Sequence, residues 1–378
     1  MRFGLSDDQV ELKATVRKFL EAQLPLVAVR TTVESEAGFD RQVWARMAQE
    51  LGLHAIGSPE EFGGTGDSLL DLTVVVEELG RALDPSPFLP SIVLVSRALV
   101  EAGGAPDWLE SLTSGEVTAS LALLEGAGTW GSLELATTAR PSSSGWTVTG
   151  DKRFVLHGHL VDSFLVSADS DEGPVLLRVD RDAPGVTCRT LETLDLTRPL
   201  SDVSFADSPA GLVGEPGQGR DILGRVLARA GVALAAEQIG GAERALEMAT
   251  AHAKERVQFG RAIGSFQSIK HLLADVLLEL ESARSAVQYA AWAFDTRQPD
   301  AAEISHVCQA VASEAFVKAA KASIQVHGAI GFTWEHDAHL FFKRASGSLQ
   351  LLGTPVEHRE ALAVGLLGEP GRGGSFTR

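Results

Sequence analysis

Apolar side chains recur at alternating spacings of four and three residues through residues 269–294, and this regularity constrains the fold more than any other feature. The stripe repeats every seven residues and consists of Ile269, Leu273, Val276, Leu280, Ala283, Val287, Ala290 and Phe294. Such a stripe covers one face of a long helix, and that face is buried against other helices. The pattern therefore predicts that this segment belongs to a helical bundle.

The rest of the chain reads as helices, then strands, then helices again. Residues 6–112 show helical periodicity, starting at the N-cap candidate Ser6. Residues 116–213 hold short runs rich in valine, threonine and leucine between turn residues, which indicates a β domain of antiparallel type. Helices and strands are not interleaved, so the predicted fold class is α+β. The expected divisions are an N-terminal helical domain at 1–115, a middle β domain at 116–216 and a C-terminal helical domain at 217–378.

Composition excludes several classes of protein. The net charge of −17 argues against nucleic-acid and anionic-membrane partners, because both need basic patches. Cys188 and Cys308 are too few for a disulfide framework or a thiolate metal cluster. No apolar run approaches the ~20 residues that span a bilayer, and the acidic start does not resemble a signal peptide. These features indicate a cytoplasmic enzyme or enzyme subunit.

Two short patterns invite a functional interpretation that their context does not support. The segment "GAGTWG", residues 126–131, fits G-x-G-x-x-G, but seryl and prolyl breaks follow it where a dinucleotide site needs a helix. We therefore interpret it as a turn between strands. The pairs His157–His159 and His336–His339 lack further ligands at metal spacing, and we interpret them as surface or loop histidines. The G-x-S-x-G of hydrolases does not occur in the sequence.

One segment does suggest a binding site. "KERVQFGRAIGSFQSIKHLLAD", residues 254–275, opens like the end of a helix, breaks at Gly260 and Gly264, and resumes as a helix from Phe266. Polar and aromatic residues gather around this break. A corner between two helices that carries such groups predicts a bound ligand, without identifying it.

Four segments in order resemble the acyl-CoA dehydrogenase family. They are "PEEFGGTGDSLLDLTVVVEELGRAL", "GDKRFVLHGHLVDSFLVSA", "ERVQFGRAIGSFQSIKHLLADV" and "QVHGAIGFTWEHDAHLFFKRA". The resemblance implies an N-terminal helical domain, a middle β domain and a C-terminal four-helix bundle, usually in a dimer of dimers. It also implies an acyl-CoA substrate, FAD lying between two subunits, a glutamate that removes the α-proton, and an electron-transfer flavoprotein as electron acceptor.

The resemblance assigns FAD contacts to the C-terminal part of the chain. In the family, these residues serve the pyrophosphate and adenosine of the neighbouring subunit's cofactor. The matching positions are Arg256, Gln258, Phe259, Phe266, Gln267, Gln325, Gly328 and Ala329. Ala329 departs from the usual second glycine. A solvated salt bridge at a helix end is the alternative role for Arg256.

The half of the site that would hold this chain's own flavin departs from the family. Leu124 precedes Glu125 where the family has a threonine, and Leu156 ends the segment 154–156 where a second threonine is usual. Leucine offers no hydrogen bond to a flavin ring.

The catalytic glutamate is also absent from both positions that the family uses. Leu352 occupies the usual position, and the alternative position falls near Ala230. We interpret Glu237 and Glu357, which lie nearby in the sequence, as ordinary glutamates on helix surfaces. The sequence therefore predicts no catalytic residue.

A retained half-site for a neighbour and a lost half-site of its own resemble the non-catalytic subunit of heterotetrameric acyl-CoA dehydrogenases. This implies an α2β2 assembly with a second family member. Two alternatives stay open at this point. One is a self-sufficient homo-oligomeric dehydrogenase with an unusual base such as Glu237, and the other is a non-enzymatic scaffold of the same fold.

Overall fold

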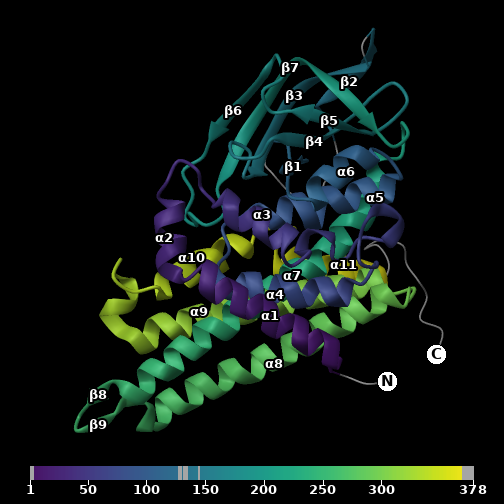
Figure 1. Ribbon diagram of the computed structural model, residues 1–378. Coiled ribbons are helices and arrows are strands. Elements are labelled where there is room, and N and C mark those ends of the chain that lie inside the picture. Colours follow the sequence, from purple (N-terminus) through teal and green to yellow (C-terminus); the bar gives the residue numbers. More distant parts are fainter. Residues whose placement is uncertain (1–3, 127–129, 131–134, 144, 368–378) are drawn as a thin grey trace, which may run out of the picture.

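Helices make up the part of the chain before the sheet (Figure 1). The computed structural model describes residues 4–126, 130, 135–143 and 145–367. The helices of this part are α1 (Asp7–Gln23), α2 (Leu26–Val33), α3 (Arg41–Gln49), α4 (Leu69–Ala82), α5 (Arg97–Ala102) and α6 (Pro106–Thr113), with a π-helical segment at Leu89–Ser96. Ser6 is the N-cap of α1 and forms a capping box with Gln9, as its sequence position predicts.

A seven-stranded sheet follows, in the order β1-β4-β5-β7-β3-β2, with β6 paired to β7. Its strands are β1 (Ala119–Ala122), β2 (Thr138–Ser142), β3 (Gly145–Leu156), β4 (Ser163–Ala168), β5 (Val175–Asp180), β6 (Val186–Thr190) and β7 (Leu200–Val213). The prediction of an antiparallel sheet is wrong for one pair, because β1 runs parallel to β4. These two strands are separated in the sequence by the β2–β3 hairpin, which provides the long connection that a parallel pair requires.

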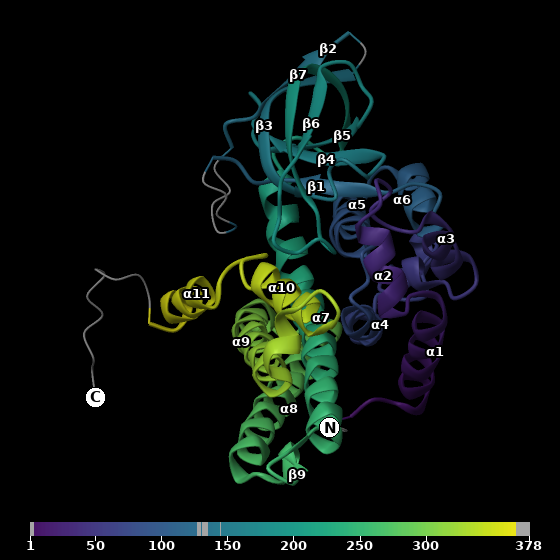
Figure 2. The same ribbon diagram turned by 90° about the vertical axis from the view of Figure 1, so that its left-hand side faces the viewer.

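The C-terminal part consists of long helices with a small hairpin at one end. Its elements are α7 (Gly219–Glu255), β8 (Val257–Gln258), β9 (Arg261–Ala262), α8 (Gln267–Asp295), α9 (Ala301–His327), α10 (Ala338–Ser348) and α11 (Pro355–Leu367). The heptad stripe lies on α8 as predicted: its members from Val276 to Ala290 are buried, and those nearer the helix ends are half-buried. Figure 2 shows the β8–β9 hairpin at the end of the bundle that is remote from the sheet.

One hydrophobic core runs through the N-terminal helices and the bundle, and a second lies within the sheet. The described secondary structure changes from helix to strand between Thr113 and Ala119, and back between Val213 and Gly219. None of the described helices has both the length and the apolar composition to cross a membrane.

A buried polar network ties the three parts of the chain together. Arg344 on α10 donates to Asp195 Oδ2 at 2.9 Å, to Glu237 Oε1 at 3.0 Å and to the carbonyl oxygen of Asp84 at 3.0 Å. These acceptors belong respectively to the loop before β7, to α7 and to the segment after α4. Arg198 donates to both carboxylate oxygens of Glu237, at 2.6 and 2.5 Å. The network fixes the loop before β7 against the bundle.

Candidate functional site

The predicted corner is a β-hairpin between α7 and α8, and its side chains face solvent. Arg256 follows the last residue of α7 and is exposed; among the described residues it has no salt-bridge partner. Phe259, in the left-handed region with φ 52°, is 92% exposed. Its ring meets Phe266 edge to face, and the Arg261 guanidinium lies 4.0 Å from the centroid of the Phe266 ring. A cation and two aromatic surfaces are therefore available to a ligand.

The amide side chains at this corner are also accessible. Gln258 and Gln267 are both exposed. Gln258 Nε2 donates to the carbonyl oxygen of the preceding residue at 2.9 Å, and Gln267 Nε2 lies 3.3 Å from His271 Nε2. These weak local contacts leave both amides able to bind a polar molecule.

The structure brings the second predicted segment, 325–329, to the same end of the bundle. Val326 packs with Ala249 and Ala253 of α7 in a small core that Ile263 also contacts. Gln325, Gly328 and Ala329 are exposed at the end of α9. Gly328 ends that helix with φ 66°, and nothing lies within 4 Å of the position a Cβ would take there. The backbone is therefore open to close approach by a ligand.

A groove with a volume of about 860 Å³ runs beside Gln325, between α8, α9 and the turn before α11. Lys318 and Lys321 line it together with apolar side chains such as Leu272 and Val356. No local pattern in the sequence predicts this groove, because its lining residues are separated by up to 84 positions and belong to different helices.

A different cavity, of about 530 Å³, lies between the sheet and the turn before α11. Leu124, Phe154, Leu156 and Leu351 line it. Leu124 and Leu156, the two leucines at the positions where the resemblance implies threonines, thus face the same space. Their separate positions in the sequence indicate this proximity only through the resemblance. Their side chains give this part of the cavity an apolar surface.

Glu125, beside Leu124, has a structural role. Its carboxylate accepts from the backbone N–H groups of Ala136 and Thr137, at 2.5 and 3.1 Å, and pairs with the buried Lys152 ammonium. Burial lowers the pKa of Lys152 to about 8, although the contact with Glu125 acts in the opposite direction. Glu125 therefore stabilises a buried cation and the start of β2.

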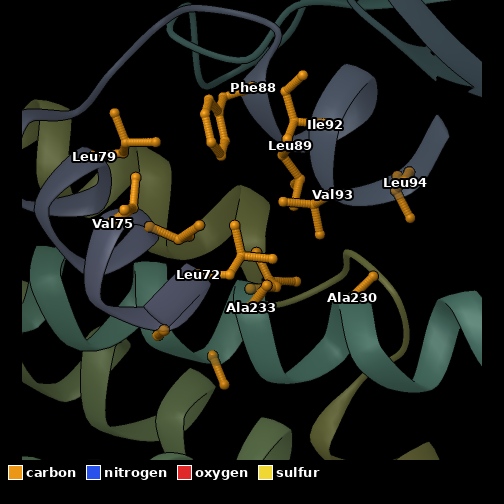
Figure 3. Close-up of a cluster of buried hydrophobic side chains, with 14 of the residues drawn as sticks. Leu72, Val75, Leu79, Phe88, Leu89, Ile92, Val93, Leu94, Ala230 and Ala233 are labelled. Atoms are coloured by element: carbon orange, nitrogen blue, oxygen red, sulfur yellow. The ribbon is translucent and has the colours of Figure 1, made fainter. Parts of the chain in front are cut away.

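Both family positions for the catalytic base are buried and apolar. Leu352 is 7% exposed, in the left-handed region with φ 61°, and belongs to the main hydrophobic core. Ala230 lies on α7 within the apolar cluster of Figure 3, and the cavity it lines with Leu72, Ile92 and Val93 measures only about 10 Å³. Such a space holds no more than about one water molecule.

The interpretation of Glu237 as a surface glutamate is wrong. Glu237 is buried between Arg198 and Arg344, because α7 crosses the interior of the molecule there. Burial opposes its ionisation, but the two guanidinium charges prevail and hold its pKa below the usual value. A carboxylate that is fully engaged with two cations is a poor proton acceptor.

Glu357 is exposed, as predicted, and it lies at the edge of the 530 Å³ cavity. Its Oε2 accepts from the backbone N–H of Thr354 at 2.7 Å, and its own N–H donates to Thr354 Oγ1 at 3.2 Å. This reciprocal arrangement is a capping box that starts α11.

The histidine interpretations need partial correction. His157 is buried with Nε2 3.0 Å from the carbonyl oxygen of Pro85, and burial lowers its pKa to about 3. His339 is also buried, because α10 packs inside the molecule, whereas His159 and His336 are half-buried. Among the described residues no group of histidines, cysteines or carboxylates could hold a metal ion. Most of the "GAGTWG" segment lies outside the described residues, which resume at residue 135, and β2 begins at Thr138.

Comparison with known proteins identifies the family. The family model for "Acyl-CoA dehydrogenase, N-terminal domain" matches residues 6–116, and that for "Acyl-CoA dehydrogenase, C-terminal domain" matches residues 217–367. Acyl-CoA dehydrogenase IpdE2 of Mycolicibacterium smegmatis is 35% identical over 95% of this chain and 98% of its own length. The chain belongs to the acyl-CoA dehydrogenase family. The resemblance inferred from four segments of sequence is thereby confirmed.

Solved structures of this family share the fold over nearly the whole chain. The ChsE4–ChsE5 complex from Mycobacterium tuberculosis contains a chain that is 28% identical, with a TM-score of 0.88 over 98% of this chain and all of that one. A variant of the Tcur3481–Tcur3483 steroid ACAD gives 30% identity and a TM-score of 0.85 over 94% of this chain and 97% of that one. Acyl-CoA dehydrogenases are flavoproteins of lipid metabolism, and FAD is the family's cofactor.

Restoring the missing carboxylate alone is expected to give no dehydrogenase. In Leu352→Glu the new carboxyl group would lie in an apolar core, where burial raises its pKa and keeps it protonated at neutral pH. Leu124 and Leu156 would still provide no hydrogen bond to a flavin. The purified variant should therefore reduce no electron acceptor with acyl-CoA substrates of different chain lengths. Turnover by the variant alone would show that this chain's own flavin site works.

Proposed function

We propose that this chain is the non-catalytic subunit of a heterotetrameric FAD-dependent acyl-CoA dehydrogenase. It would supply the pyrophosphate and adenosine contacts of an FAD whose flavin ring lies against a second family member. The observation that carries this proposal is the contrast between the two half-sites. The corner around Arg256 exposes a cation, aromatic rings and amides, whereas leucines occupy positions 124, 156 and 352, where the family resemblance leads us to expect flavin donors and the base.

The residues at the bundle end fit the phosphate-bearing part of FAD. The Arg256 guanidinium can donate two parallel hydrogen bonds to phosphate oxygens. The open backbone at Gly328 allows amide groups to approach a phosphate, and the exposed Gln258, Gln267 and Gln325 offer further donors. When bound to the complex, FAD would accept the hydride from the β-carbon of the acyl group.

The bundle end and the sheet lie at opposite ends of the molecule (Figures 1 and 2). The bundle-end residues would therefore act on the cofactor of another chain. This geometry supports a shared site.

An acyl group has no access to the buried carboxylate of Glu237. The cavity beside Glu237 measures about 10 Å³, as does the one beside Ala230. Glu237 is paired with two arginines. Proton abstraction would consequently depend on a glutamate of the partner subunit, and this chain would act by holding the cofactor.

The names of two similar structures support a heteromeric assembly. Each names two proteins, ChsE4 with ChsE5 and Tcur3481 with Tcur3483. We propose an α2β2 arrangement for this chain with a comparable partner, and an electron-transfer flavoprotein as the acceptor. Because the second structure is described as a steroid ACAD, acyl-CoA thioesters of steroid ring systems belong in any substrate test, beside straight-chain acyl-CoAs.

The self-sufficient enzyme is the second candidate function, and Glu357 now favours it more than Glu237 does. Glu357 lies beside the larger cavity, although its carboxylate is engaged in starting α11. A lone chain that binds FAD, turns over, and loses turnover in Glu357→Gln would establish this alternative. The scaffold alternative would instead require a complex that forms without FAD.

Flavin stoichiometry tests the proposal directly. The chain purified alone should hold little or no FAD and show no turnover. Co-produced with its partner, it should form an assembly of four chains with two FAD, measured by flavin absorbance and light scattering. A lone homotetramer that is fully loaded with FAD and active would overturn the proposal.

A further inference from the structure

Three histidines from α7, α9 and the segment before α10 form a row between the two cofactor-contact segments. The ring centroids of His252 and His327 are 4.4 Å apart, and those of His327 and His336 are 4.1 Å apart. We call these three residues the histidine row. His252 lies one turn before Arg256 on α7, and His327 directly precedes Gly328 at the end of α9. The row therefore joins the segments on which FAD binding would depend.

The hydrogen bonds of the row indicate which ring nitrogens carry protons in two of its members. His327 Nδ1 lies 2.7 Å from the carbonyl oxygen of Ser323, which can only accept, so Nδ1 carries the proton. His336 Nδ1 accepts from the backbone N–H of Ala338 at 3.1 Å and therefore has no proton of its own. Protonation of His336 at this atom would break the hydrogen bond at the start of α10.

Charged groups of both signs surround the row. Glu255 and Arg256 lie beside His252, at the end of α7. From α2, Arg30 donates to Asp337 Oδ1 at 2.6 Å and to the carbonyl oxygen of His336 at 2.9 Å. On α10, His339 and Lys343 lie against Trp334.

The pKa directions agree with this geometry. Burial, followed by the neighbouring His327, lowers the pKa of both His252 and His336. The pKa of such a histidine is lower in the folded chain than in the unfolded chain. Its contribution to the free energy of unfolding is therefore fully present above the ordinary pKa of about 6.5 and is lost as the pH falls below that value.

We propose that His327 is a positioning residue, which holds segments 256–267 and 325–329 at the separation that FAD requires, and that protonating a second ring of the row separates them. This inference rests on the proposed function. Two adjacent imidazolium rings repel each other across about 4 Å, and each segment is attached to one side of the row. FAD binding by the complex therefore weakens as the pH falls below about 6.5.

The first test measures FAD affinity of the apo-complex by fluorescence titration at pH 7.5 and 5.5. The wild-type complex should bind FAD severalfold more weakly at pH 5.5, with about tenfold as the upper limit, since uptake of one proton changes an equilibrium by at most about tenfold per pH unit. His327→Gln keeps a donor but removes the ring that lies against both neighbours, so its ratio of FAD dissociation constants, pH 5.5 over pH 7.5, should fall to about twofold. His252→Gln, a replacement at the half-buried end of the row, should act in the same direction.

His159→Gln is the matched control, because His159 is a half-buried histidine of the middle part of the chain, where it bonds to Ser201. This variant should show the same ratio of FAD dissociation constants, pH 5.5 over pH 7.5, as the wild type. The inference would be overturned if the wild type and both row variants had the same ratio of FAD dissociation constants at the two pH values, or if FAD bound more tightly at pH 5.5. Either result would leave the proposed function standing. A complex without FAD at pH 7.5 would overturn the proposed function, and the inference with it.

The second test needs no cofactor. In the lone chain, the histidine ring protons of His252 and His336 should titrate in NMR spectra below pH 6.5, and the pKa of His336 should rise in His327→Gln. Ordinary titration near pH 6.5 in the wild-type chain would show that the rings are not coupled, and would overturn the inference whatever the complex binds.

Discussion

Arg256→Ala is expected to weaken FAD binding by the heteromeric complex about ten- to a hundredfold. The substitution removes charge-assisted hydrogen bonds to phosphate. Their loss costs about 1.5–3 kcal/mol of binding free energy. The guanidinium is exposed and forms no salt bridge with the described residues, so its removal should not disturb the fold. FAD affinity, measured by titration of the apo-complex, reports the effect.

Two further variants make this experiment specific. Arg256→Lys keeps the charge but loses the two parallel donors, and should fall between wild type and Arg256→Ala. Arg140→Ala removes an exposed arginine from β2 in the middle part of the chain and should leave FAD affinity unchanged. If Arg256→Ala binds FAD as tightly as Arg140→Ala does, Arg256 does not contact the cofactor.

The sequence predicted those parts of the fold that depend on local periodicity. The heptad stripe of α8 and the N-cap at Ser6 each reflect interactions within one helix, and the structure has both. The parallel pairing of β1 with β4 was not predictable in the same way, because alternation and turn residues identify strands but not their partners. Residues 119–122 and 163–166 carry no local signal that distinguishes a parallel neighbour from an antiparallel one.

In the candidate site too, only the features that depend on local sequence could be predicted. The break at residues 256–266 is visible in the sequence, because two glycines interrupt a helical pattern there. The burial of Glu237 is not visible, because it depends on Arg198 and Arg344, which approach it from a loop and from another helix. An isolated glutamate on a helix is usually exposed, and only the tertiary structure shows that two cations compensate this one.

Arg344→Met is expected to lower the free energy of unfolding by about 3–5 kcal/mol, the usual cost of removing one partner from a buried ion pair. Arg344 is 2% exposed, and its donors serve a carboxylate on α7, a carboxylate in the loop before β7 and a carbonyl group after α4. Methionine fills much of the same volume, so the loss would come mainly from uncompensated polar groups. Urea unfolding monitored by circular dichroism measures the change.

An exposed arginine provides the comparison for this prediction. Arg359 pairs with Glu314 at the surface, with both side chains about half exposed, so Arg359→Met should cost no more than about 1 kcal/mol. Combining Arg344→Met with Glu237→Gln should cost less than the sum of the two single changes, because the amide removes the charge that Arg344 compensates. Equal destabilisation by Arg344→Met and Arg359→Met would contradict a structural role for the network. A large difference would mean that Glu237, Arg198 and Arg344 together stabilise the contact between the three parts of the chain. Glu237, held by two cations, is then not available for proton transfer.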